Sequence, residues 1–284
     1  MTLEDPQQAT LSVQERGLYA MVAPLTDVGR KRARNEDNLL ILPLGGGTAP
    51  QNGEVSAVSV REPGLLLVVA DGMGGHHGGE IASQVSVETL AREIVPQLHQ
   101  TGAERPDVPA ALQRAVTAAH RALFSYAQSA PNHETMGTTL TAALVCGARA
   151  DVAQVGDSRA YLLRDGSLIL LTQDQTIGNQ LRNRGENPAL VNPRIAELLT
   201  QAVGAQPEIK VIMTAIDLVA YDLLLLCSDG LYKAVSSAEL VQILEMDLPL
   251  GEKARRLIMR GNENGGPDNI TVVLVGLCPT RRRA

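Results

Sequence analysis

The pattern of hydrophobic and polar positions predicts strands at both ends of the chain and helices between them. Continuous or alternating apolar runs predict strands at 18–27, 37–44, 64–70, 138–146, 150–156, 158–164, 167–172, 209–216, 221–227 and 269–277. Apolar residues at helical spacing predict helices at 78–99, 108–129, 237–246 and 251–260. A short linker joins the first two helices, which should therefore pack antiparallel.

Short connections between the strands indicate the fold class. The run Arg164-Asp165-Gly166-Ser167 is a typical hairpin turn between two of the predicted strands. Because most connections are of this hairpin kind, antiparallel sheets with helices packed outside them are expected, which is an α+β fold.

Polar segments set the expected limits of the domain. Residues 1–17 are expected to form a polar extension, 18–278 a single domain, and 279–284 a basic tail. One compact domain is expected because strands at both ends flank the paired helices.

Two inserts interrupt the predicted strands. Residues 45–63 are poor in large apolar side chains and are expected to form an exposed hairpin. Residues 173–207 are polar, with short helical patterns at 177–184 and 194–200, and strand patterns resume after them. This second insert is therefore not a linker between domains.

Composition excludes several classes of protein. The 284 residues carry a net charge of -6 and only 2% aromatic side chains, which argues against a nucleic-acid binder. No apolar run approaches the roughly 20 residues that span a bilayer, and no signal sequence is evident. Cys146, Cys227 and Cys278 show no CxxC spacing and are expected to be buried, inert thiols. A cytoplasmic protein without a membrane span is expected.

Acidic residues recur where predicted strands begin or end. Asp71-Gly72 and Asp229-Gly230 each close an apolar run. The other acidic residues of this kind precede a strand or lie at a turn between strands: Glu36, Asp37, Asp157 and Asp268. Each one alone could simply cap a turn.

Together these carboxylates indicate bound cations. Several buried carboxylates at one end of a sheet would repel one another and lose hydration unless cations neutralised them. Oxygen ligands without histidine or cysteine suit Mg²⁺ or Mn²⁺. The absence of a side chain at Gly72 would let its carbonyl oxygen approach an ion.

Six motifs, in order between about residues 18 and 277, resemble the metal-dependent serine/threonine protein phosphatases of the type 2C family in their bacterial form. They are "TDVGRKRARNED", "VVADGMGGHHGGEIAS", "MGTTLTAALV", "VAQVGDSRAYLLRDG", "LLLLCSDGL" and "GGPDNITVVLV". The resemblance implies a four-layer α-β-β-α sandwich, with two antiparallel sheets flanked by antiparallel helix pairs and two metal ions at one end.

The resemblance also implies roles for the acidic residues. By position, Asp71 would bridge two Mn²⁺ or Mg²⁺ ions, and Gly72 would bind one of them through its carbonyl. Asp229 and Asp268 would hold the other ion. Metal ligands are also implied at Glu36 and Asp37, directly or through water, and Asp157 with Asp229 would hold a third, weaker ion.

The expected reaction is hydrolysis of phosphoserine and phosphothreonine monoesters by a hydroxide that bridges the two ions. Catalysis would then depend on Asp71, Asp229 and Asp268 as ligands. Arg32 matches the phosphate-binding arginine of the family, although it could instead be a solvated member of a basic loop.

The leaving group needs a proton, and His76 is the candidate donor. Metal-bound water is the alternative donor, and packing at a helix start is the alternative role for His76. Ser158, beside Asp157, is expected to be a turn serine and not a nucleophile. Gln175 stands where relatives often carry histidine, and the surrounding insert corresponds to a flap that affects substrate choice.

The expected partners are proteins phosphorylated on serine or threonine, including a Ser/Thr kinase, and a monomer is expected. Two other functions are compatible with the sequence. One is a phosphatase-like sensor or scaffold of weak activity, although the metal aspartates are all present. The other is a metal-dependent phosphodiesterase.

Overall fold

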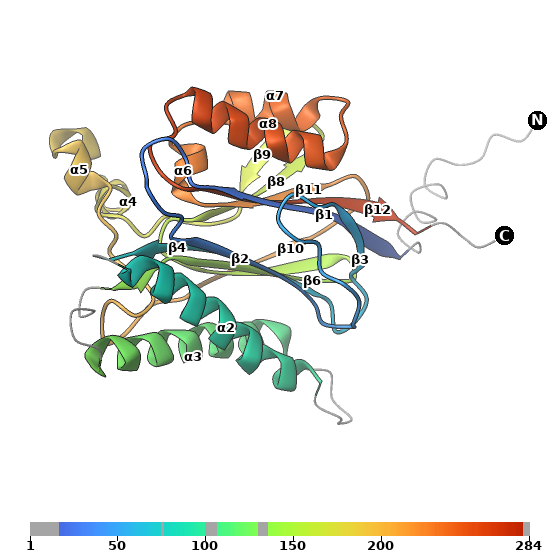
Figure 1. Cartoon of the computed structure of the whole chain (residues 1–284), viewed down its shortest axis with the longest axis horizontal. Coiled ribbons are helices and arrows are strands. Elements are labelled where there is room, and N and C mark those ends of the chain that lie inside the picture. Colours follow the sequence, from blue (N-terminus) through green and yellow to red (C-terminus); the bar gives the residue numbers. More distant parts are fainter. Residues whose placement is uncertain (1–16, 75–76, 100–106, 130–135, 281–284) are drawn as a thin grey trace, which may run out of the picture.

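Two facing β-sheets with a pair of helices over each outer face form the molecule (Figure 1). The structure is a computed structural model that describes residues 17–74, 77–99, 107–129 and 136–280. The four-layer α-β-β-α arrangement predicted from the sequence is confirmed. The expected N-terminal extension and basic tail lie almost wholly outside the described residues, and the expected domain limits stay predictions.

The first sheet is entirely antiparallel. Its strands, in spatial order, are β3 (Ser56–Ser59), β1 (Leu18–Asp27), β12 (Ile270–Pro279), β11 (Leu223–Cys227), β8 (Arg159–Arg164) and β9 (Ser167–Leu170). The predicted hairpin joins β8 to β9, and Asp165 and Gly166 have φ angles of 48° and 75° at its turn. Such angles suit an Asp-Gly pair, because glycine and, less easily, aspartate accept positive φ.

The second sheet is also antiparallel. Its order is β10 (Ile212–Asp217), β7 (Arg149–Val155), β6 (Leu140–Cys146), β4 (Leu65–Met73) and β2 (Asp37–Pro43). A short strand, β5 (Gly137–Thr138), pairs with the end of β4. Asp37 and Asp71 are direct neighbours across β2 and β4, so the register alone brings two predicted ligands together.

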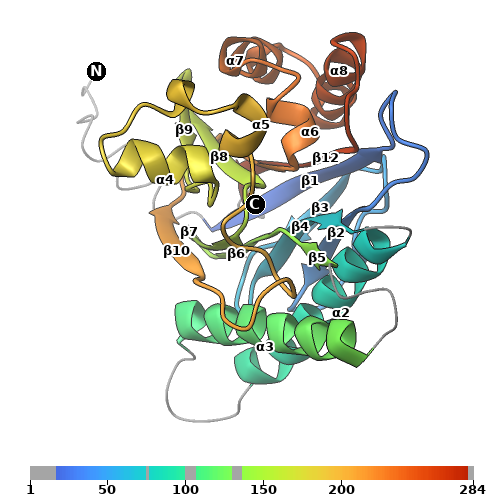
Figure 2. The same ribbon diagram turned by 90° about the vertical axis from the view of Figure 1, so that its left-hand side faces the viewer.

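The helices cover the outer faces of the sheets. α2 (Gly78–Leu98) and α3 (Val108–Ser129) run in opposite directions against the second sheet, and α7 (Ser237–Glu245) and α8 (Leu250–Glu263) cover the first (Figure 2). Within the described ranges, none of the helices is long and apolar enough to cross a bilayer.

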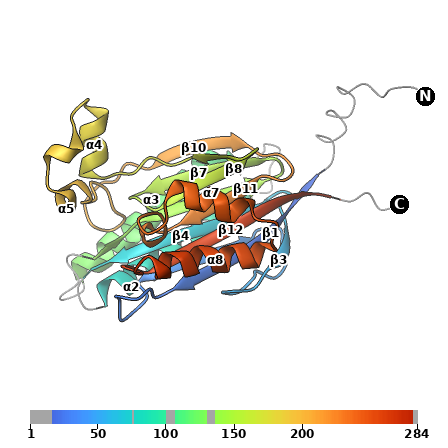
Figure 3. The same cartoon turned by 90° about the horizontal axis from the view of Figure 1, so that it is seen from above.

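Three short helices complete the described fold. α6 (Asp229–Tyr232) follows β11 almost directly and was not predicted. α4 (Ile177–Asn183) and α5 (Pro193–Ala196), with the 3₁₀ turn η1 (Pro188–Leu190), project from one end of the sandwich (Figure 3). We refer to residues 173–207, which contain them, as the flap.

Strand β4 shows how the layers are held together. Its even-numbered residues, Leu66, Val68 and Ala70, pack in the cluster beneath α2 and α3. Its odd-numbered residues, Leu65, Leu67 and Val69, pack in the cluster between the sheets. Because both faces of the strand are buried, its sequence is a continuous apolar run and not an alternating one.

The described chain ends lie beside each other, away from the flap (Figure 1). Leu18 and Pro279 pair in the register of β1 and β12, and the Thr280 amide donates to the Gly17 carbonyl at 2.8 Å.

Two expectations from the sequence were partly wrong. The insert 45–63 is not an exposed hairpin throughout, because β3 pairs with β1 and both Val58 and Val60 are buried. Val55, in the same insert, is by contrast exposed. Of the three cysteines, only Cys227 is buried, whereas Cys146 and Cys278 are partly exposed.

The glycines of the two Asp-Gly motifs allow close approach of backbone segments. A Cβ atom at Gly72 would lie 2.0 Å from the carbonyl oxygen of Gly79, and one at Gly230 would lie 2.0 Å from that of Asn269. Both distances are far below van der Waals contact, and the obstructing atoms belong to backbone. Steric necessity is therefore a reason for glycine at both positions, in addition to access for a metal ion.

We expect Gly230→Ala to lower the free energy of unfolding by about 1–3 kcal/mol, the usual cost of forcing atoms into a packed site. Urea denaturation would measure the change. Gly45→Ala is the matched control, because the nearest atoms to its new Cβ would be 3.8 Å away. Equal midpoints for the two variants would contradict the steric explanation.

Candidate metal centre

A cavity of about 230 Å³ at one end of the sandwich gathers most of the residues predicted to form the site. Its lining residues are Arg32, Glu36, Asp71, Gly72, Met73, Gly74, Thr139, Asp157, Glu197, Leu199, Asp229, Lys233 and Asp268. They come from the end of β4, from Thr139 before β6, from α6 and Lys233 directly after it, from the loops before β2 and β12, from the turn after β7, and from the flap. Residues far apart in the sequence thus meet in one space, as the spacing of strand ends predicts.

Asp71 is fixed at the end of β4 by two threonines. Its amide donates to the Thr139 hydroxyl at 2.9 Å, and its carbonyl accepts from the Thr139 amide and the Thr138 hydroxyl, each at 2.9 Å. Burial, followed by the charges of Asp37 and Asp229, raises the pKa of the Asp71 carboxyl well above its ordinary value. A cation beside the carboxylate would offset this shift, because it stabilises the ionised form.

Asp37 lies behind the cavity, at the junction of the two sheets. Its Oδ2 accepts hydrogen bonds of 2.7 Å from the hydroxyls of Ser228 and Thr271, both from the first sheet's side. Its Oδ1 is buried and has no hydrogen-bond partner among the described residues. Burial, chiefly, raises the pKa of Asp37 to about 7, and the charge of Asp229 adds to the effect.

Asp229 begins α6, and its two carboxylate oxygens have different surroundings. Within the part of the chain that the structure describes, the buried Oδ1 has no hydrogen-bond partner. Oδ2 instead accepts from the ammonium of Lys233, one helical turn later, at 2.6 Å. One oxygen is thus available to a further ligand while the other is engaged.

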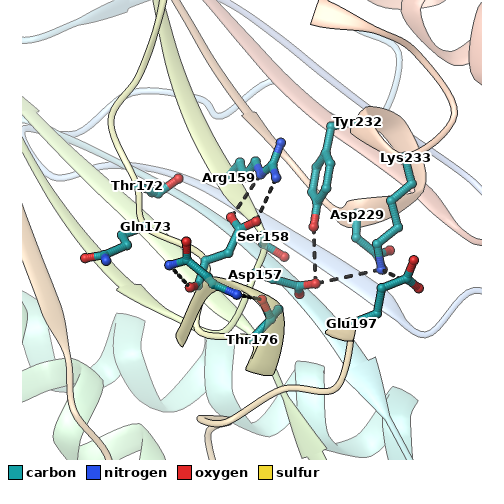
Figure 4. A network of polar contacts seen from close by, with 12 residues as sticks. Asp157, Ser158, Arg159, Thr172, Gln173, Thr176, Glu197, Asp229, Tyr232 and Lys233 are labelled. Atoms are coloured by element: carbon teal, nitrogen blue, oxygen red, sulfur yellow. Dashed lines mark hydrogen bonds and ion pairs between the residues drawn. The ribbon is translucent and has the colours of Figure 1, made fainter. Parts of the chain in front are cut away.

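Asp157 belongs to the polar network around Lys233 (Figure 4). Its Oδ2 accepts from the Tyr232 hydroxyl at 3.1 Å and lies 3.8 Å from the Lys233 ammonium. The same ammonium lies 3.9 Å from Glu197 at the end of α5. Burial, followed by the charge of Asp229, raises the pKa of Asp157 to about 6.

Asp268 and Arg32, which also line the cavity, form an ion pair. The Arg32 Nη2 donates to the Asp268 Oδ2 at 2.7 Å, and the Asp268 Oδ1 accepts from the Asn269 amide at 2.9 Å. The Arg32 side chain is 49% exposed, so its remaining N–H groups can reach an anion in the cavity. This position is compatible with both interpretations of Arg32, as a phosphate-binding residue and as a solvated member of the basic loop.

Asn269 organises the loop that carries Glu36. Its side-chain oxygen accepts from the Glu36 amide at 2.9 Å, and its Nδ2 donates to the carbonyls of Val28 and Arg34 at 2.9 and 2.8 Å. Burial raises the pKa of the Glu36 carboxyl, as it does for the aspartates. The three hydrogen bonds of Asn269 tie this loop to the start of β12, next to Asp268.

The residues present fit hard divalent cations. Two buried carboxylate oxygens, Oδ1 of Asp37 and Oδ1 of Asp229, lack partners among the described residues, and the available donors are oxygens only. As the side chains stand, no group of three or more histidine, cysteine or acidic residues in the described ranges is placed so that it could hold a metal ion. Two of the predicted ligands are instead paired with side-chain cations, Asp268 with Arg32 and Asp229 with Lys233.

The candidate histidine donor cannot be placed, because His76 lies outside the described residues. Its neighbour His77 instead contacts the Arg34 guanidinium, and its Nδ1 lies 3.7 Å from Glu80. Among the described residues that line the cavity there is no histidine. His76 therefore stays a prediction.

Two residues singled out in the sequence have structural contacts. Ser158 is fully buried, with its hydroxyl 2.6 Å from that of Thr139, which fits a turn serine and not a nucleophile. The side chain of Gln175 accepts from the Gly156 amide and donates to the Lys210 carbonyl, each at 2.7 Å. It thus ties the base of the flap to the turn that carries Asp157.

Several residues of the site were not predicted from the sequence. They are Thr139, Glu197, Ser228, Tyr232, Lys233 and Asn269. For Lys233 there was a signal, because it follows Asp229 by four residues and so shares a helix face with it. For Asn269 the signal was weaker, because only its position directly after the predicted ligand Asp268 pointed to the site.

We expect the metal-free protein to lose stability as the pH rises from about 4 to 7. The folded-state pKa values of Asp37 and Asp157 are raised to about 7 and about 6, above the unfolded value near 4. Their contribution to stability is therefore complete below pH 4 and is lost as pH rises through the folded values.

Urea midpoints of chelator-treated protein at pH 5 and pH 8 would measure the loss, and Mn²⁺ should restore stability at pH 8. The variant Asp37→Asn should reduce the difference between the two midpoints. A metal-free protein that is more stable at pH 8 than at pH 5 would contradict the expectation.

Known proteins similar to this chain are phosphatases. The family model described as protein phosphatase 2C matches residues 53–257. The serine/threonine phosphatase stp of Listeria innocua is 36% identical over 253 residues, which are 88% of this chain and 93% of that protein. The serine/threonine protein phosphatase PstP of Mycobacterium tuberculosis is 36% identical over 261 residues, 90% of this chain and 45% of the longer relative.

Solved structures agree with this relationship. The catalytic domain of PstP in complex with two manganese ions has a TM-score of 0.73 and 36% identity, covering 92% of this chain and 99% of that one. The serine/threonine phosphatase of S. agalactiae has a TM-score of 0.77 and 29% identity, covering 91% and 99%. Because the family model matches residues 53–257, which are more than half of the chain, this chain belongs to the protein phosphatase 2C family.

Proposed function

We propose that this protein hydrolyses phosphoserine and phosphothreonine monoesters in proteins, using two bound Mn²⁺ or Mg²⁺ ions. The observation that carries the proposal is the single cavity in which Asp71, Asp229 and Asp268 meet beside Arg32. Carboxylates suited to divalent cations and a guanidinium suited to phosphate thus face the same space.

The acidic residues would hold the two ions. Asp71, the Gly72 carbonyl, Asp229 and Asp268 would supply the main oxygen ligands. Glu36 and Asp37 would complete the set, directly or through water. When bound, the ions supply a water of lowered pKa and neutralise charge on the phosphoryl oxygens.

Arg32 orients the phosphoryl group. Its guanidinium is held at the edge of the cavity by one hydrogen bond to Asp268, which leaves other N–H donors for phosphoryl oxygens. An arginine restrained in this way loses less freedom on binding than a fully solvated one. Asp268 thereby acts twice, as a metal ligand and as the residue that positions Arg32.

The substrates are phosphorylated proteins, including a Ser/Thr kinase, and the enzyme acts as a monomer in the cytoplasm. A protein substrate would reach the cavity beside the flap, because Glu197 and Leu199 line the cavity wall. A cytoplasmic site is compatible with the cysteines, which form no disulfide within the described part of the chain.

The purified protein should hydrolyse phosphoserine and phosphothreonine peptides with added Mn²⁺ and lose this activity with a chelator. Asp71→Asn and Asp229→Asn should each reduce turnover to background, because each replaces a negatively charged metal ligand with a neutral one. Asp165→Asn is the control, since it removes the same charge at the turn from β8 to β9. A phosphate-release assay would measure all three variants.

Other outcomes of this assay would favour other functions. An inactive wild-type protein that still binds Mn²⁺ would point to a sensor or scaffold, and preference for a phosphodiester would point to a phosphodiesterase. Wild-type turnover in both aspartate variants would refute the assignment of the site.

Arg32→Ala should raise KM for phosphate esters, and its effect on kcat/KM should be on the order of 100-fold, the usual result of removing one preorganised donor to a reacting oxyanion. Arg30→Ala removes the same charge from the same loop and should leave KM near the wild-type value. Steady-state kinetics would compare them. Equal effects of the two substitutions would indicate only a general contribution of the basic loop.

A further inference from the structure

Lys233 lies between Asp157 and Asp229, the two aspartates to which the family resemblance assigns a third, weaker ion. Its ammonium is 2.6 Å from Asp229 Oδ2 and 3.8 Å from Asp157 Oδ2. It also lies 3.9 Å from Glu197 of the flap (Figure 4). One positive charge thus stands within 4 Å of three carboxylates.

The two oxygens that face this space are already engaged. Asp229 Oδ2 accepts the short hydrogen bond from Lys233, and Asp157 Oδ2 accepts from the Tyr232 hydroxyl at 3.1 Å. The oxygen of Asp229 without a partner among the described residues is Oδ1, not Oδ2. The Asp229 oxygen that is available to a further ligand is therefore not the one that accepts from Lys233.

Neighbouring contacts keep the network in place. The Arg159 guanidinium lies 3.6 Å over the centre of the Tyr232 ring and forms a two-pronged pair with Asp174, at 2.9 and 2.7 Å. Tyr232 is therefore held with its hydroxyl on Asp157. Because α6 begins at Asp229, Lys233 follows one turn later, and its ammonium reaches the same carboxylate.

We propose that the Lys233 ammonium takes the place of a third divalent ion between Asp157 and Asp229. The inference rests on the proposed two-metal site, which it limits to two ions. A divalent ion at this position would need Asp229 Oδ2, which Lys233 holds, and would be repelled by the adjacent ammonium. The lysine supplies a permanent positive charge to the two aspartates. Its ion pair with Glu197 also connects this position to the flap.

The number of bound Mn²⁺ ions tests the proposal independently of activity. Isothermal titration calorimetry of the metal-free wild-type protein with Mn²⁺ should give a stoichiometry of two bound ions per chain. Lys233→Asp replaces the ammonium with a carboxylate and should raise the number to three. Lys210→Asp makes the same charge change at an exposed residue that is not among those lining the cavity, and should still bind two.

Three bound ions in the wild type, or only two in Lys233→Asp, would overturn the inference while leaving the two-metal site intact. No bound Mn²⁺ in any of the proteins would overturn the two-metal site itself.

Anomalous diffraction from wild-type crystals soaked in Mn²⁺ provides a second measurement that needs no variant. Two peaks, with the Lys233 ammonium between Asp157 and Asp229, would support the proposal. A third peak at that position would refute it, even if Lys233→Asp failed to fold.

Discussion

Repulsion among buried carboxylates is the constraint on which the functional end of this molecule depends. Asp37, Asp71, Asp157 and Asp229 are held close together where water is scarce, and the pKa values of the first three are raised as a result. Such an arrangement is unfavourable in an empty protein and becomes favourable around cations. The carboxylate cluster therefore lowers the stability of the metal-free fold, and the hydrophobic layers beneath it must offset this cost.

The junction of the two sheets makes this arrangement possible. Asp37 and Asp71 belong to the second sheet, whereas Ser228 and Thr271, which bind Asp37, belong to the side of the first. The site is thus a set of contacts across the interface between sheets. The hydrophobic cluster between the sheets consists, among the described residues, of aliphatic side chains, and their close packing fixes how the two halves meet at this polar edge.

Much of this could be predicted from the sequence, because strand periods and Asp-Gly strand ends are local signals. The antiparallel sheets with outer helices, the β8–β9 hairpin and the convergence of Asp71, Asp229 and Asp268 followed from them, whereas the four-layer order came from the family resemblance. The role of Lys233 did not, since a lysine near an aspartate is usually a solvated pair. The strand β3 was missed because two buried valines in a polar segment give too short a pattern.

The pairing of Leu18 with Pro279 has a consequence for the topology of the chain. With the ends of its described part hydrogen-bonded to each other, the domain is nearly a closed ring, and a short peptide could join these ends without disturbing either sheet. A circular permutant opened at an exposed loop would keep every strand neighbour. The order in which the strands are synthesised is therefore separable from the architecture that they build.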